Sequence, residues 1–338
     1  MSADRTIDTR PSLLRALRDR LPRTIDRRVV VAAWATLVVQ IGIVGTGGLV
    51  RLTGSGLGCP TWPECTNGSL VATPEMGIHG VIEFGNRLLT FVLAIVAIAM
   101  FLFVVRMRRT RRDLFWLALV IGLYIPLQAV LGGITVLTNL NPYVVGLHFF
   151  ASAILVALSA LLVARVYAVP GPRARAVPRW YSTLAWATAV LTVITVVVGI
   201  LVTGSGPHAG DGGASRNGLD PELMQHVHSW PAYATFGLTL ALLIGARWTG
   251  AAQRLTLWAT LLLSVEVVQI VVGVWQARTG LPIVLVNIHM VLAMLLVAAM
   301  TAALVHLTQA VSPVPLAPAD DEVSDRMRPG SAAPAIRR

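Results

Sequence analysis

Eight apolar segments, each long enough to cross a lipid bilayer, constrain the fold of this 338-residue chain more than any other feature. A membrane-spanning helix needs about 20 mostly apolar residues. Only 13% of the residues are charged, about half the share typical of a soluble protein. We therefore predict an all-α integral membrane protein with eight transmembrane helices, at residues 29–50, 80–105, 114–137, 143–168, 181–203, 226–246, 254–276 and 284–309.

The arginines predict how these helices cross the membrane. They concentrate at both ends of the chain and in every second loop, whereas the alternate loops hold only Arg51, Arg216 and Arg278. Because basic loops stay in the cytoplasm, both termini are expected there, in a multi-pass protein of the cell (plasma) membrane. This distribution of arginines accounts for the net charge of +11 in a protein whose partner is the lipid bilayer. It argues against nucleic acid as the partner.

An internal repeat relates the two halves of the chain. Gln128 precedes His148 by 20 residues, and Gln269 precedes His289 by the same interval. The segment Thr-Gly-Ser-Gly occurs after the first predicted span and again after the fifth. Four spans per half return the chain to the same side, so the sequence predicts two tandem four-helix bundles related as parallel repeats.

The repeat divides the chain into five segments. Residues 1–28 hold eight arginines and no apolar run, so we expect a basic cytoplasmic segment rather than a signal peptide. The N-terminal four-helix bundle is expected over 29–168. A cytoplasmic linker, 169–180, leads to the C-terminal four-helix bundle, 181–309. The tail, 310–338, is rich in Pro, Ala and Asp and is expected to be disordered.

Four histidines lie near the outer ends of the even-numbered spans: His79, His148, His228 and His289. An ionisable side chain at the centre of a bilayer costs about 2.5–3.5 kcal/mol, so such residues usually have a function. Paired imidazoles in a helical bundle are a common way to hold haem iron. His226 is an alternative to His228, and only one of the two can face the iron, because residues two apart on a helix point to different sides.

The most polar segment within a predicted span runs from His79 to Arg87. His79, Glu83 and Arg87 are spaced four residues apart, and Asn86 shares their helix face. One interpretation is an ion pair between Glu83 and Arg87 that stabilises the start of the helix. The other, which we favour, is that Arg87 binds an anionic group such as a haem propionate and Glu83 acts catalytically near the substrate.

Two long external loops hold further candidate residues. Cys59 and Cys65 lie in the first, where an oxidising compartment favours a disulfide that is either structural or redox-active. His208 lies in the second loop, where it contacts a propionate, caps the bundle or is exposed to solvent. Arg51, at the start of the first loop, is a further candidate for a propionate contact. Loops of this length are expected to cover the two sites.

Across residues 29–309 the chain resembles the haem A synthase family, membrane enzymes that convert haem O to haem A for cytochrome c oxidase. The resemblance rests on three polar segments, 47–60, 83–87 and 204–211, and on the helix-start histidines. It implies that His228 and His289 bind the iron of haem b. It also implies that the N-terminal bundle receives haem O, with His148 binding its iron.

The chain departs from the family at two positions. Asn86 stands where the family usually has the histidine of a Glu-x-x-His-Arg motif on the second helix, and Ser229 follows His228 in place of an arginine. Asparagine is a poor iron ligand. Either His79, about 10–11 Å away along the helix, serves on that side, which we slightly favour, or His148 holds the substrate haem alone.

The resemblance implies a haem-dependent oxidoreductase that oxidises the C8 methyl of haem O to a formyl group through an alcohol. Haem b is then the cofactor and haem O the substrate. The farnesyltransferase that makes haem O and an electron donor are the expected partners. A dihaem b-type electron carrier linked to quinol is the alternative, although it needs haems on both sides of the membrane. A transporter built on a parallel repeat is a third hypothesis.

Overall fold

The computed structural model describes residues 19–249 and 253–311. This part of the chain holds eight helices that are long and apolar enough to cross a membrane. They are α2 (Arg27–Leu52), α3 (Gly77–Val104), α4 (Arg112–Leu137), α5 (Pro142–Val166), α6 (Arg179–Ser205), α7 (Pro221–Trp248), α8 (Gln253–Arg278) and α9 (Ile283–Val305). The prediction of an all-α, multi-pass membrane protein is confirmed.

Short polar sequences begin several of these helices. The Asp26 carboxylate accepts main-chain hydrogen bonds at the start of α2. Asn141 and Asp220 do the same for α5 and α7, and each is followed by a proline in the first turn. An Asx side chain satisfies main-chain N–H groups that have no helical partner, and proline lacks the N–H that would otherwise be exposed there.

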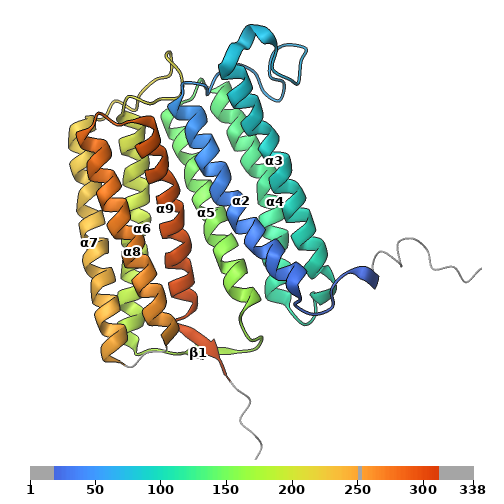
Figure 1. The fold of residues 1–338 in the computed structure, drawn as a ribbon, viewed down its shortest axis with the longest axis vertical. Coiled ribbons are helices and arrows are strands. Elements are labelled where there is room, and N and C mark those ends of the chain that lie inside the picture. Colours follow the sequence, from blue (N-terminus) through green and yellow to red (C-terminus); the bar gives the residue numbers. More distant parts are fainter. Residues whose placement is uncertain (1–18, 250–252, 312–338) are drawn as a thin grey trace, which may run out of the picture.

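The helices pack in two groups that share a central contact (Figure 1). Helices α2–α5 form one group and α6–α9 form the other. The two groups meet where α2 and α5 pack against α9. The largest apolar core fills the first group and includes Met294 of α9. The predicted division at 169–180 falls between these groups, and the relation of the groups as a tandem repeat stays a prediction.

Two long loops cover one end of the helices, which we call the loop end (Figure 1). The first loop is residues 53–76 and contains the short 3-10 helix η1 (Pro74–Met76). The second loop is residues 206–220. A second 3-10 helix, η2 (Val105–Met107), follows α3 at the opposite end.

Two ends differ from the predicted spans by more than three residues: α7 begins at Pro221, five residues before 226, and α9 ends four residues before 309, at the opposite end of the bundle. The helix predicted over 284–309 ends at Val305, and Thr308–Ala310 forms strand β2. This strand pairs antiparallel with β1 (Arg173–Arg175), in the predicted linker. Main-chain pairing with a distant segment therefore ends α9 early. The predicted disordered tail beyond 311, and residues 1–18 of the predicted basic segment, lie outside the described residues.

Candidate functional site

Three half-buried imidazoles at the loop end each lie against a glycine of the preceding helix. A Cβ atom added to these glycines would come within 3.3, 2.9 and 3.0 Å of the histidine Cε1 atom. Any larger residue would therefore displace the ring. The pairs are His148 with Gly132, His228 with Gly199 and His289 with Gly273.

These three imidazoles share an unusual hydrogen-bonding state. The Nδ1 atoms of His148, His228 and His289 are buried and have no hydrogen-bond partner among the described residues. A buried polar atom without a partner costs about 1–3 kcal/mol, and native proteins keep few of them. Three imidazoles are thus set against glycines with one ring nitrogen unsatisfied, an arrangement suited to ligands of a bound group.

His228 and His289 form a close pair between α7 and α9. Their ring centroids are 6.3 Å apart and the rings are inclined at 73°. An imidazole nitrogen binds a metal at about 2.0–2.1 Å and lies about 1.1 Å from its ring centre, so two rings sharing one metal are about 6.3 Å apart. His226 is exposed. The structure therefore places His228, and not His226, beside His289.

A metal between these rings would need additional ligands. In residues 19–249 and 253–311 no group of three or more His, Cys, Asp or Glu side chains could hold a metal ion. A porphyrin supplies its own equatorial nitrogens and needs only axial ligands from the protein. The donor set, two imidazoles and no carboxylate, thus fits haem.

The repeated glutamines position the histidine helices. Gln128 donates from Nε2 to the main-chain carbonyl of His148 at 3.2 Å, and Gln269 donates in the same way to His289 at 3.1 Å. The matching sequence segments thus have matching local geometry. Each bond fixes the histidine helix against the helix before it.

Asn86 has the corresponding position on α3. Its Oδ1 accepts a 2.8 Å hydrogen bond from the Thr46 hydroxyl, and its Nδ2 lies 3.9 Å from the Cβ that Gly47 would carry. Asn86 therefore faces a glycine of the preceding helix, as the three histidines do. On α3, the residue in this arrangement is an amide rather than an imidazole.

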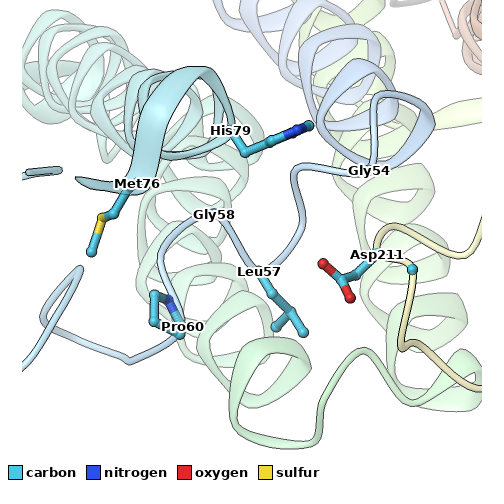
Figure 2. A pocket seen from close by; sticks show the side chains of 8 residues that line it. Gly54, Leu57, Gly58, Pro60, Met76, His79 and Asp211 are labelled. Atoms are coloured by element: carbon cyan, nitrogen blue, oxygen red, sulfur yellow. The ribbon is translucent and has the colours of Figure 1, made fainter. Parts of the chain in front are cut away.

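His79 lies elsewhere, among the two loops. Its exposed ring forms a 2.9 Å hydrogen bond through Nδ1 with the Ser55 hydroxyl. It lines a pocket of about 590 Å³ together with Asp211 of the second loop (Figure 2). The remaining lining residues are Gly54, Leu57, Gly58, Pro60, Met76 and Gly212. Its role as an iron ligand stays a prediction, while the observed contact joins α3 to the first loop.

The ion pair considered from the sequence is present. Arg87 Nη2 lies 2.6 Å from Glu83 Oε1, and Glu83 Oε2 accepts a 2.7 Å bond from the Cys59 N–H. Cys59 and Cys65 form the predicted disulfide. Arg87 also donates to three main-chain carbonyls of that loop, those of Cys59, Thr61 and Glu64. The pair therefore anchors the disulfide loop to α3, and its roles in catalysis and propionate binding stay predictions.

Two further residues join parts of the loop end. His208 contacts the carbonyl of Leu281 through Nε2 at 2.9 Å, so it holds the second loop to the turn between α8 and α9. Arg51 donates to the carbonyl of Thr203 at 2.6 Å, which links α2 to α6. These partners could not be predicted from the sequence, and neither could the glycine contact made by each histidine.

The described residues thus form eight helices able to span a membrane, with half-buried imidazoles that lie against glycines and have an unsatisfied Nδ1, which defines a membrane protein suited to bind haem. The chain matches the family described as "Cytochrome oxidase assembly protein" over residues 30–301, and it belongs to that family.

Proteins named "Heme A synthase" are among its relatives. The one from Listeria welshimeri is 33% identical over 135 residues, which is 40% of this chain and 44% of that protein. The one from Bacillus pumilus is 35% identical over 137 residues, 38% of this chain and 42% of the relative. The one from Geobacillus kaustophilus is 34% identical over 140 residues, 41% and 43% of the two chains. Each match thus spans less than half of the relative's length.

Proposed function

We propose that this protein is a haem A synthase, a haem-dependent membrane oxidoreductase that acts on haem O. The proposed reaction oxidises the C8 methyl to a formyl group through an alcohol, for cytochrome c oxidase assembly. It would proceed by two hydroxylations, each using dioxygen as the oxidant with two electrons from the donor and two protons and releasing one water, after which the doubly hydroxylated carbon loses water to give the formyl group. Membership of the assembly-protein family and the names of the relatives support this role. The observation that supports it most is the pair His228 and His289, whose ring centroids have the spacing of two imidazoles on one metal and whose Nδ1 atoms form no hydrogen bond within the described residues.

His228 and His289 would hold haem b. When bound there, haem b supplies one-electron chemistry, and the protein contributes position and electrostatics. Gly199 and Gly273 keep each ring in place from the neighbouring helices. The C-terminal bundle would thus pass electrons to the substrate site in the N-terminal bundle.

His148 would hold the iron of haem O in the N-terminal bundle. Its ring is fixed by Gly132 and its helix by Gln128. On α3, Asn86 offers an amide whose oxygen already accepts a hydrogen bond from Thr46. We infer that the substrate is held through His148 alone, so its other face is free for the reaction.

Glu83 is the candidate catalytic residue. Both of its oxygens are engaged, one by Arg87 and the other by the Cys59 N–H. A proton-transfer role therefore requires the ion pair with Arg87 to open. The same bonds hold the disulfide loop against α3. If that loop moves to admit the substrate, Glu83 would therefore lose its bonds to Arg87 and to the Cys59 N–H at the same time.

The proposed setting is the plasma membrane, with both termini cytoplasmic and the loop end outside. The positions of the basic loops support this orientation. Haem O would arrive from the farnesyltransferase that makes it, and an electron donor would reduce haem b.

The test is haem extraction with mass spectrometry after expression in a host that makes haem O but no haem A. We expect haem b together with haem A or its alcohol precursor in the wild type. His148→Ala should keep haem b and lose the oxidised products, while His226→Ala, at an exposed position, should match the wild type. Two equivalents of haem b and no oxidised product would instead support the dihaem electron carrier, and a colourless protein would support the transporter.

A further inference from the structure

Arg51 places a positive charge in the interior of the loop end without an acidic partner. Its Nη2 donates to the carbonyl of Thr203, and its Nε is buried and has no partner. Arg216 lies close enough to interact with it electrostatically, and itself donates only to main-chain carbonyls. No ion pair joins either arginine to an acid within the described part of the chain. A partly buried arginine with a second, exposed arginine close to it favours an anion beside them.

The face of α2 that carries Arg51 lies against the helix of His289. Gly48 and Arg51 are three residues apart and share this face. A Cβ atom at Gly48 would collide with Asn287 Oδ1 and lie 3.3 Å from Met290 Cε. Asn287 and Met290 lie within two residues of His289 on α9, so α2 packs against α9 at the level of this histidine.

The hydrogen-bond partner of Arg51 lies on the helix that packs against His228. Thr203 is one helical turn beyond Gly199, whose carbonyl accepts a 2.8 Å bond from the Thr203 hydroxyl. Gly199 is the residue against which the His228 ring lies. The Arg51 guanidinium is therefore about 6 Å nearer the loop end than the level of His228.

We propose that Arg51, supported by Arg216, binds a propionate carboxylate of the haem held by His228 and His289. This inference rests on the proposed haem site. Within a membrane protein, a carboxylate needs a cation or water, and the loop end supplies the nearest unpaired cations. The N-terminal bundle thereby contributes an anchoring residue to the haem of the C-terminal bundle.

The second loop encloses this site. Gly210 has a left-handed backbone with φ 103°, and a Cβ atom there would lie 3.6 Å from Arg51 Cγ. Its carbonyl accepts a 2.8 Å bond from the Gly56 N–H of the first loop. Because His208 ties the same loop to Leu281, a carboxylate beside Arg51 would be shielded from water, which strengthens a charge-assisted hydrogen bond.

The proposal predicts that the protein distinguishes haem from its dimethyl ester, in which both propionates are neutral. Full-length apoprotein in detergent would be titrated with each compound. The wild type should bind haem more tightly than the ester by about tenfold or more, the size of one charge-assisted hydrogen bond. Arg51→Gln should bind the two with nearly equal affinity, and Arg216→Gln should lose part of the preference. Arg278→Gln, at an exposed arginine of the same end, should keep the wild-type preference.

Each other outcome overturns the proposal. An Arg51→Gln variant that still prefers haem would show that the carboxylate binds elsewhere, and so would a wild type that binds both compounds equally. If the wild type binds neither haem nor its dimethyl ester, the protein has no haem site, and the proposed function is wrong as well. If Arg51→Gln does not fold, the proposal is tested by Arg216→Gln alone, whose preference for haem over the ester should be smaller than that of the wild type. This variant is suitable because the Arg216 guanidinium donates its hydrogen bonds to main-chain carbonyls of the second loop.

Discussion

Gln269 donates a hydrogen bond of 3.1 Å to the main-chain carbonyl of His289, the residue 20 positions later. Removing the bond in Gln269→Leu should lower the free energy of unfolding by about 0.5–1.5 kcal/mol. It should also lower the amount of haem b per chain, because α9 is less well fixed against α8. Thermal unfolding and haem content measure the two effects. Gln128→Leu, the equivalent change in the other half, should leave haem b unchanged, and equal loss in both variants would contradict this.

The glycine beside His228 should not tolerate a side chain. In Gly199→Ala the new Cβ would lie 2.9 Å from the imidazole and push the ring out of position. We expect haem b content to fall severalfold. Gly237→Ala is the matched control, because a Cβ there meets nothing within 4 Å, and alanine is the better helix former by about 1 kcal/mol. Normal haem b in Gly199→Ala would show that the glycine contact does not position the ligand.

Loss of the negative charge of Glu83 should separate haem b binding from catalysis. Glu83→Gln removes an ion pair whose two side chains are 7% and 22% exposed, which costs about 3 kcal/mol for a buried pair. Haem b should stay bound, since its ligands are on α7 and α9, while oxidation of haem O should stop. The products are measured by mass spectrometry. A folded Glu83→Gln protein with full activity would remove Glu83 from the mechanism.

The position of Asn86 predicts a gain of iron binding. Asn86→His would place an imidazole where α3 faces Gly47, and should yield a tightly bound second haem and slower turnover. His79→Ala should leave haem content unchanged, because His79 contacts Ser55 in the first loop. The two variants are compared by haem-to-protein ratio. Loss of the substrate haem in His79→Ala would instead make His79 the ligand.

Much of the fold could be predicted from the sequence, because apolar length and the alternation of arginines are local signals. All eight predicted spans correspond to helices, with ends that differ by a few residues. The end of α9 was missed, because it depends on pairing between β1 and β2, more than a hundred residues apart.

The site was less predictable, because its contacts join residues that are far apart in the sequence. The histidine candidates and the Cys59–Cys65 disulfide came from local spacing. The contact from Arg51 to Thr203 crosses 152 residues, and no local pattern specifies it. The bonds that Arg87 makes to the disulfide loop were also invisible, because their acceptors are main-chain carbonyls that any sequence provides.

The central claim, that His228 and His289 hold one haem between them, is tested most directly by the visible absorption spectrum of the purified protein expressed without a source of haem O. We predict one low-spin haem per chain with two histidine ligands. That spectrum should be lost in both His228→Ala and His289→Ala, and kept in His226→Ala. An unchanged low-spin spectrum in either of the first two variants, or its loss in His226→Ala alone, would contradict the account.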